Sequence, residues 1–287
     1  MPRPVARPPF PDTPGAWLAN YRYRQRGESG QPPSAEQVGA LLGVSGPTLR
    51  RWETGRARPS GADLRRFAEV CGLMPIETEF LLRAFSGQPR EEAPDEATFR
   101  AAASELLSTD FPAYILDTFF FTRAWNSYAD ALFDVPTDPQ VHVLSSLLRA
   151  VVQGRATPEW ERRIQRRLRD FWLSTASPCG SEPYKRVLAS LCAEPGFEER
   201  WCRLALEPGD LVGQVIRAPY DINTERFGAF RVFPARMVLP PIYELREYVP
   251  LDAKARRRLE TFRELRSPAI GFSAYVHWAV DPRLSPE

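Results

Sequence analysis

Residues 34–59 constrain the fold of this chain most, because they fix two short helices around one sharp turn. A serine stands before each helix, where its side chain can cap the free backbone N–H groups. Gly43 supplies the positive φ that the turn needs, and Gly39 lets a second backbone approach closely. Leu49 and Trp52 lie three residues apart and are predicted to face inward. This arrangement is typical of a helix-turn-helix that inserts its second helix into the DNA major groove.

Six polar residues on or beside the second helix are the candidate DNA-binding residues. Arg50 and Arg51 are expected to read bases, because a guanidinium can pair with guanine O6 and N7. Arg56 and Arg58 follow the helix and are expected to contact phosphates. An ordinary helical hairpin with a solvated outer face is the alternative interpretation. The full predicted set is Ser45, Thr48, Arg50, Arg51, Arg56 and Arg58.

The uneven distribution of charge favours double-stranded DNA as a partner. The net charge of the chain is only +2, but the first 90 residues carry 13 arginines against 8 acidic residues. The remainder carries 25 basic and 28 acidic residues. The N-terminal third is therefore the positive end of the chain, as expected for a DNA-binding module.

Several classes of protein are disfavoured by what the sequence lacks. There is no apolar run of eighteen residues, so no membrane span is expected, and no apolar segment of a secretory signal is visible near the start. Four cysteines show no CxxC spacing, and only two histidines are present, which argues against a metal site. The nucleophile-elbow, phosphate-loop and dinucleotide-binding motifs are missing. The expectation is a cytoplasmic protein that is not an enzyme and has no metal or resident cofactor.

Composition and periodicity predict two domains. A Pro-rich flexible tail is expected at residues 1–14, and a five-helix, all-α bundle containing the helix-turn-helix at residues 15–86. Residues 87–95 are rich in Pro and charge and read as a linker. Residues 96–287 are predicted to form an α+β domain, because helical patterns give way to period-two strands of an antiparallel sheet after residue 211.

Two patterns within the second domain carry further predictions. Residues 111–126 are expected to form a β-hairpin whose alternation places Phe120, Thr122 and Ala124 on one face. Residues 157–174 are expected to form the longest helix, with an apolar stripe on one side. The opposite side is predicted to be a solvated basic face, or else a second nucleic-acid surface. Its arginines are Arg162, Arg163, Arg166, Arg167 and Arg169.

The segment LGVSGPTLRRWETGRARPS resembles the XRE family of helix-turn-helix domains, through its Gly-Val-Ser, its Glu-x-Gly and its trailing Pro-Ser. The resemblance covers about residues 17–85. Ala35 stands where the family often has a phosphate-contacting Gln, and Gly46 and Pro47 replace base-reading side chains of some members. These departures place readout at Thr48, Arg50 and Arg51. The resemblance also implies a homodimer that binds half-sites about 10 base pairs apart.

The segment PAYILDTFFFTRAWN and the later PGFEERW resemble the ligand-binding domain of MmyB-like transcription regulators. Members of that family place an XRE-type helix-turn-helix before a PAS-like domain, so the resemblance implies a transcription regulator that senses a small molecule. Phe119 and Phe121 depart from the polar residues usual at those strand positions. The tail after about residue 251 has no counterpart in the family that we can name.

The expected ligand is a small, largely apolar molecule such as a fatty acid. Its predicted surroundings are aromatic and aliphatic, and the second domain has no Gly-rich phosphate loop. A hydroxyl group, or an arginine at the rim, would anchor the head group. The alternative is a packed dimerisation or protein-docking module without a ligand. The candidate ligand-binding residues are Tyr114, Phe120, Thr122, Trp125, Leu148, Trp172, Arg217, Phe230 and Tyr243.

Overall fold

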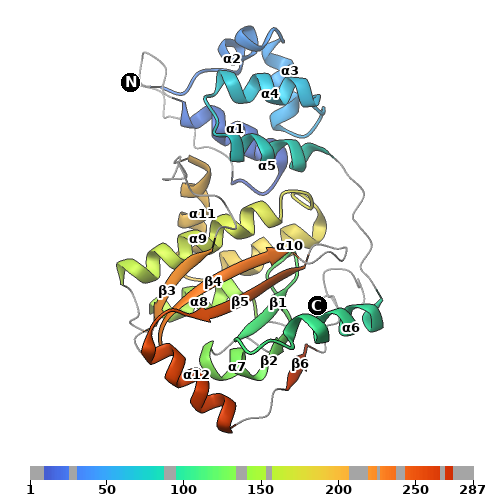
Figure 1. The fold of residues 1–287 in the computed structure, drawn as a ribbon. Helices are drawn as coiled ribbons and strands as arrows, with labels where there is room; N and C mark the ends of the chain where they lie inside the picture. Colours follow the sequence, from blue (N-terminus) through green and yellow to red (C-terminus); the bar gives the residue numbers. More distant parts are fainter. Residues whose placement is uncertain are drawn as a thin grey trace. The chain divides into compact units, whose positions relative to one another are not determined.

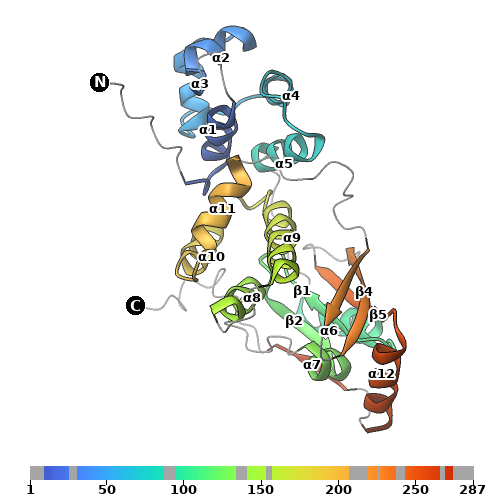
Figure 2. The same ribbon diagram turned by 90° about the vertical axis from the view of Figure 1, so that its left-hand side faces the viewer.

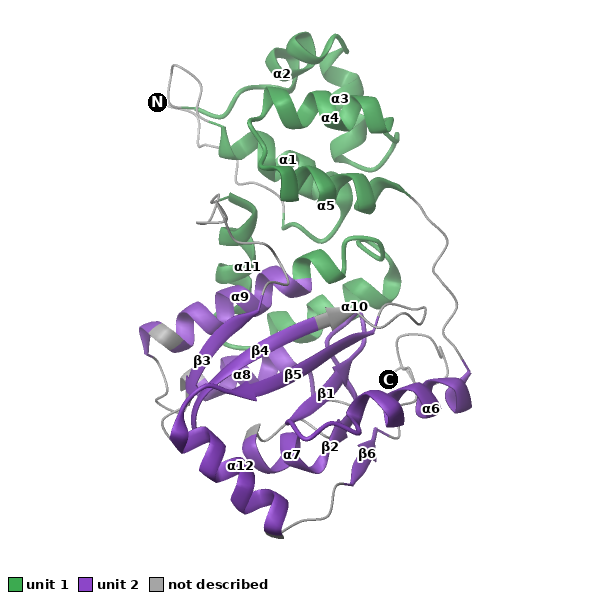
Figure 3. Ribbon diagram, viewed as in Figure 1, with its two compact units in different colours: residues 1–89, 172–213 green, residues 90–171, 214–287 purple. Residues whose placement is uncertain are grey.

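The chain folds into two compact units, each assembled from two separate stretches of sequence (Figure 3). Unit 1 comprises Met1–Pro89 and Trp172–Gly213, and unit 2 comprises Arg90–Phe171 and Gln214–Glu287. A helical N-terminal region followed by an α+β region with one antiparallel sheet confirms the predicted fold class. The computed structural model describes residues 10–25, 31–86, 95–133, 141–152, 157–206, 219–224, 227–236, 243–265 and 269–273.

Unit 1 begins with the five predicted helices. They are α1 (Pro14–Arg24), α2 (Ala35–Leu42), α3 (Gly46–Glu53), α4 (Gly61–Val70) and α5 (Pro75–Ser86). The first four start where a hydroxyl side chain accepts a backbone hydrogen bond. The caps are Thr13, Ser34, Ser45 and Ser60.

Residues 10–14 do not form part of a loose tail, contrary to the prediction. Thr13 accepts a hydrogen bond from the Ala16 backbone nitrogen at 3.1 Å, so α1 already starts at Pro14. The buried carbonyl of Pro11 accepts a hydrogen bond from the Trp201 indole at 3.2 Å. Residues 1–9, the rest of the predicted tail, lie outside the described residues.

Unit 1 is completed by the end of α9 (Pro158–Ser174) and by α10 (Glu182–Cys192) and α11 (Phe197–Leu206). Their aromatic side chains surround Trp17 of α1, which is fully buried. The Trp17 ring lies 5.5 Å from that of Trp201 and 5.8 Å from that of Trp172, centroid to centroid. Trp172 in turn stacks on Phe80 of α5 at 4.5 Å. The helix-turn-helix region therefore shares its core with residues from a distant part of the chain.

This shared core changes the predicted domain division. The sequence places residues 96–287 in one domain, whereas residues 172–213 belong to the same compact unit as the helix-turn-helix region. The reason is tertiary: large aromatic side chains gain most by burial against each other, and linear sequence does not record which partner they choose. Of the predicted linker, only Asp95 is described, and it caps α6 (Glu96–Leu107).

Unit 2 is built on a six-stranded antiparallel sheet with the order β3-β4-β5-β1-β2-β6 (Figure 1). The strands are β1 (Ala113–Leu116), β2 (Thr122–Asn126), β3 (Tyr220–Thr224), β4 (Gly228–Arg236), β5 (Glu244–Pro250) and β6 (Ile270–Phe272). The helices entirely within this unit are α6, α7 (Ser127–Phe133), α8 (Val143–Val152) and α12 (Ala253–Leu265). Parts of the region after residue 211 in which strands were predicted, including residues 211–218 and 274–287, lie outside the described residues.

Both faces of this sheet are covered by helices. On one face, which we call the α6 face, Phe99 of α6 packs with Ile115, Ala124 and Tyr243. The opposite face, the α9 face, meets α9, since Arg167 donates a hydrogen bond to the Tyr114 hydroxyl at 3.2 Å. Figure 2 shows α8 and α9 on one side of the sheet and α12 on the other.

The predicted hairpin of β1 and β2 is confirmed, but its alternation was predicted wrongly. Ile115 pairs with Ala124 and Leu116 pairs with Thr122, so the register shifts between these two pairs. Arg123 is the extra residue of the resulting bulge. Thr122 and Ala124 therefore lie on opposite faces of the sheet.

Candidate functional site

The hairpin of α2 and α3 has the geometry that its glycines predict. Gly43 adopts a left-handed φ of 74° at the turn between the two helices. A Cβ on Gly39 would lie 2.8 Å from the Val44 carbonyl oxygen, which is closer than real contacts allow. Small side chains thus bring the start of α3 tightly against α2, and α3 is held at a fixed angle.

Helix α3 presents a polar outer face because its apolar pair is buried. Leu49 and Trp52 lie in the core of unit 1, as predicted, and they leave Arg50 and Arg51 exposed. Within the described part of the chain, Arg51 makes no ion pair, so its guanidinium stands available to a partner. Short, capped and rigidly seated, α3 has the features required of a recognition helix.

The two hydroxyl residues at the start of α3 bond to each other. The Ser45 side chain accepts a hydrogen bond from the Thr48 backbone nitrogen at 3.2 Å, and the two hydroxyl oxygens lie 2.9 Å apart. Ser45 therefore caps the helix, and the Thr48 hydroxyl contacts that cap. Ser45 is exposed and Thr48 partly exposed, so both stay candidates for DNA contact.

The two arginines after α3 differ in their contacts. Arg56 is exposed and has no ion pair among the described residues. Arg58 is also exposed, but its Nε donates a hydrogen bond at 2.7 Å to the Phe85 carbonyl near the end of α5. This bond stabilises the carboxyl end of that helix, where a cation is favoured. Arg56 is therefore better placed than Arg58 for the predicted phosphate contact.

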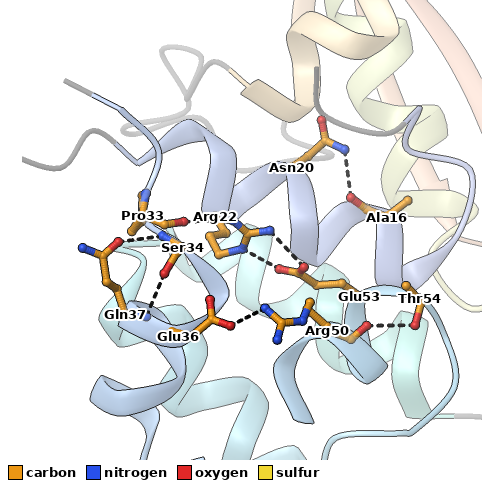
Figure 4. A network of polar contacts seen from close by, with 10 residues as sticks. All are labelled: Ala16, Asn20, Arg22, Pro33, Ser34, Glu36, Gln37, Arg50, Glu53 and Thr54. Carbon is orange, nitrogen blue, oxygen red and sulfur yellow. Dashed lines mark hydrogen bonds and ion pairs between the residues drawn. The ribbon is translucent and has the colours of Figure 1, made fainter. Parts of the chain in front are cut away.

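A buried ion pair that sequence reasoning missed anchors the end of α3. Arg22 of α1 donates two hydrogen bonds to the Glu53 carboxylate, at 2.6 and 2.9 Å, and a third to the Pro33 carbonyl at 2.9 Å (Figure 4). The side chains of Arg22 and Glu53 are only 10% and 8% exposed. Arg22 lies four residues after the inward-facing Leu18, and this spacing is the signal that its side chain also faces inward.

Residues 24–81 match a family model described as a helix-turn-helix domain. The matched segment contains α2, α3 and α4 and ends within α5, so it includes the whole surface described above. No curated protein matches the chain. The helix-turn-helix domain, with its exposed arginines, supports a DNA-binding regulator.

The candidate ligand-binding residues are only partly brought together. Strand pairing puts Tyr114, Thr122, Trp125 and Phe230 on the α9 face of the sheet. Phe120 precedes β2 with a left-handed φ of 61°, and its ring lies 5.7 Å from that of Phe171 on α9. Leu148 is fully buried on α8, as are Phe120 and Phe230 in the sheet region.

Three other candidate ligand-binding residues are not placed on the α9 face. Tyr243 packs on the α6 face, where its ring lies 4.7 Å from that of Phe99. Trp172 belongs to unit 1 and stacks on Phe80. Arg217 lies outside the described residues. The proposed surroundings of a ligand must therefore be drawn from the α9 face alone.

The α9 face carries buried charge, which the sequence analysis did not foresee. Arg167 of α9 was predicted to be solvated, but its side chain is only 3% exposed. Arg246 of β5 is fully buried, donates a hydrogen bond at 3.0 Å to Asp170 and also contacts Glu244. Charged residues occur at successive positions of β5, whose sequence is ELREYVP, and nothing in that pattern marks Glu244 and Arg246 as buried.

Tyrosine hydroxyls complete this polar layer. The hydroxyl oxygens of Tyr114 and Tyr248 lie 2.9 Å apart, and both accept hydrogen bonds from Arg167 Nη2. Burial raises the pKa of Tyr248, which keeps the hydroxyl protonated at neutral pH. Arg167 Nη1 is buried and lies 3.7 Å from Asp170 Oδ2, too far for a hydrogen bond, so a bound acceptor group could satisfy this donor.

The described residues show neither a membrane span nor a metal site. None of the helices that the structure describes combines the length and apolarity needed to cross a bilayer. Across the same residues, no three His, Cys, Asp or Glu side chains gather closely enough to hold a metal ion.

Proposed function

We propose that this chain is a transcription regulator that binds a duplex DNA operator through α3. The observation that carries the proposal is the pair Arg50 and Arg51, exposed on a short helix whose other side is fixed by Leu49 and Trp52. The protein acts in the cytoplasm and is not an enzyme. A homodimer is proposed because one short helix reads only a few base pairs, and two-fold symmetry doubles the site.

The experiment begins with selection of duplexes from a pool with a randomised centre by the purified full chain. The enriched sequences are expected to contain two half-sites about 10 base pairs apart. Replacing Arg50 and Arg51 together by Ala should then weaken binding to an enriched duplex. Each lost base contact costs about 1–3 kcal/mol and relaxes one position of the site. Binding is measured as the dissociation constant at one fixed salt concentration.

Arg83→Ala provides the matched control. It removes one positive charge from unit 1, where the double variant removes two, and Arg83 lies on α5 and pairs with Glu79 at 2.7 Å. Parent-like binding by the double variant at Arg50 and Arg51 would show that α3 is not the recognition helix. Enriched sequences with a single half-site would instead contradict the homodimer.

For unit 2 we propose a PAS-like, MmyB-like sensor of a small apolar ligand with an acidic head group, such as a fatty acid. The support is Arg167, a buried cation whose Nη1 makes no hydrogen bond among the described residues, on the face of the sheet that also carries the buried Phe230. A carboxylate would satisfy that donor, and a charge-assisted hydrogen bond of this kind is strong. Burial of the acyl chain would add about 0.8 kcal/mol per CH₂.

A second candidate function for unit 2 is a packed dimerisation or protein-docking module without a ligand. The observation that favours it is the complete burial of Phe120, Leu148 and Phe230. Buried ion pairs such as Arg246 with Asp170 also occur in cores without ligands. The two candidates differ in whether a molecule occupies the α9 face.

Extraction of the purified protein distinguishes the two candidates. Denaturation followed by extraction into organic solvent should release acyl chains from the parent if unit 2 is a sensor. Adding a fatty acid to stripped protein should raise its unfolding temperature, since a ligand that binds only the native state stabilises it. An extract without acyl chains, together with no thermal shift, would support the packed module.

A further inference from the structure

An acidic residue stands on the surface that is proposed to face DNA. Glu36 lies in the first turn of α2, and its carboxylate accepts a hydrogen bond from Arg50 Nη1 at 2.5 Å (Figure 4). Both side chains are about half exposed, at 59% for Glu36 and 50% for Arg50. A carboxylate near DNA phosphates is repelled, so its presence beside a recognition arginine calls for a physical reason.

Gly46 at the start of α3 makes this contact possible. A Cβ at Gly46 would lie 3.0 Å from Cα, Cγ and Cδ of Glu36, which is tighter than nearly all real contacts. The stem of Glu36 therefore lies directly against the first turn of α3, over a position without a side chain. The close packing of α2 and α3 fixes the direction in which the Glu36 side chain extends toward Arg50. The ion pair therefore depends on the backbone of both helices and not only on two flexible side chains.

The contact leaves most of the guanidinium available. Arginine has five N–H donors in a rigid planar fork, and Glu36 engages only Nη1. A free arginine side chain loses much rotamer freedom when it is fixed on a base edge. An arginine already held by a carboxylate loses less, and its plane is oriented before DNA arrives.

We propose that Glu36 is a positioning residue that orients Arg50 and thereby sets its preference for one base pair. This inference rests on the proposed DNA-binding function of α3. Glu36 also acts against non-specific binding, because its charge offsets that of Arg50 toward phosphates at unrelated sequences. Exposed ion pairs contribute little to folding stability, so the effect of Glu36 is expected in recognition rather than in stability.

Three duplexes and two variants test the proposal. The duplexes are one enriched by the parent, the same duplex with the guanine read by Arg50 replaced, and a scrambled sequence. Glu36→Asp keeps the charge but shortens the side chain by one methylene, which breaks the 2.5 Å contact with Arg50. Glu36→Ala removes the charge as well. Glu79→Asp, in an exposed pair with Arg83 on α5, is the matched control.

The expected readout is the ratio of the dissociation constants for scrambled and enriched DNA. Glu36→Asp should lower this ratio about three- to thirtyfold with little change in binding to scrambled DNA. Glu36→Ala should lower it by a similar factor and should bind scrambled DNA more tightly, since one repelling charge is gone. The discrimination against the replaced guanine should fall in both variants. Unfolding temperatures should stay near that of the parent, as should all binding by the control.

The Arg50→Ala background separates failure of this inference from failure of the proposed function. If Arg50 reads a base through Glu36, then Arg50→Ala alone lowers the ratio, and adding Glu36→Asp changes nothing further. If Arg50→Ala lowers the ratio but Glu36→Asp keeps that of the parent within twofold, the positioning role is refuted and base readout by Arg50 stands. If Arg50→Ala itself keeps the parent ratio, both base readout by Arg50 and its positioning by Glu36 are refuted.

Discussion

Replacing Glu53 by Ala is expected to lower the free energy of unfolding of unit 1 by about 3–5 kcal/mol, because it leaves a buried charge without its partner. Arg22 donates two hydrogen bonds to Glu53 from a position that is only 10% exposed. Without the carboxylate, its remaining described bond is to the Pro33 carbonyl. The substitution also detaches the last residue of α3 from α1, so α3 should fray at this end.

Urea unfolding of the full chain, followed by circular dichroism, measures this loss. Glu79→Ala is the control, because Glu79 also pairs with an arginine but is about half exposed. The control should cost less than about 1 kcal/mol. Replacing Arg22 and Glu53 together by Leu should recover part of the stability, since no buried charge then remains unpaired. A loss below about 1 kcal/mol for Glu53→Ala would show that water solvates Arg22 and that the pair does not hold α3.

Trp17→Ala should cost a similar amount, about 3–5 kcal/mol, by opening a cavity in the aromatic core of unit 1. Trp17 is fully buried, and its ring lies 5.0 Å from that of Phe80 and 5.5 Å from that of Trp201. These neighbours belong to helices far apart in sequence, so the loss should loosen α11 from the helix-turn-helix domain. Trp17→Phe keeps most of the apolar volume and should cost clearly less.

The stability is measured by urea unfolding, and the packing by protease digestion near α11. Cleavage within residues 172–206 should become faster in Trp17→Ala than in Trp17→Phe. If both variants unfold like the parent, the end of α9 and helices α10 and α11 do not share a core with α1. Leu41→Ala, at an apolar side chain that is 69% exposed, is the control for loss of an apolar residue outside the core.

The helix-turn-helix domain could be predicted from sequence because its signals are local. Serine caps, the left-handed Gly43 and the inward pair Leu49 and Trp52 each act within a few residues. The Arg50–Glu36 pair was not predictable in this way. It links residues 14 apart in the chain, and only the close approach of two helices at Gly46 brings them into contact.

Long-range packing explains what could not be predicted in the rest of the chain. Arg167 looks solvated beside the other arginines of α9. Its side chain is buried, however, because the sheet lies against that side of the helix and places Tyr114 and Tyr248 within hydrogen-bond distance. The bulge at Arg123 reverses the strand alternation and so separates Thr122 from Ala124. A prediction based on strict alternation of side chains along a strand fails where one extra residue is inserted.

Because the aromatic core around Trp17 combines early and late parts of the chain, it can be completed only late in protein synthesis. A ribosome adds about 5–20 residues per second, so Trp172 and Trp201 emerge roughly ten to forty seconds after Trp17. Throughout that interval the nascent helix-turn-helix domain displays the rings of Trp17 and Phe80, which Trp172 of α9 and Trp201 of α11 will later cover. We therefore expect the half-made chain to expose apolar surface of the kind that holding chaperones bind, and DNA binding at full strength to begin only after residue 206 has left the exit tunnel.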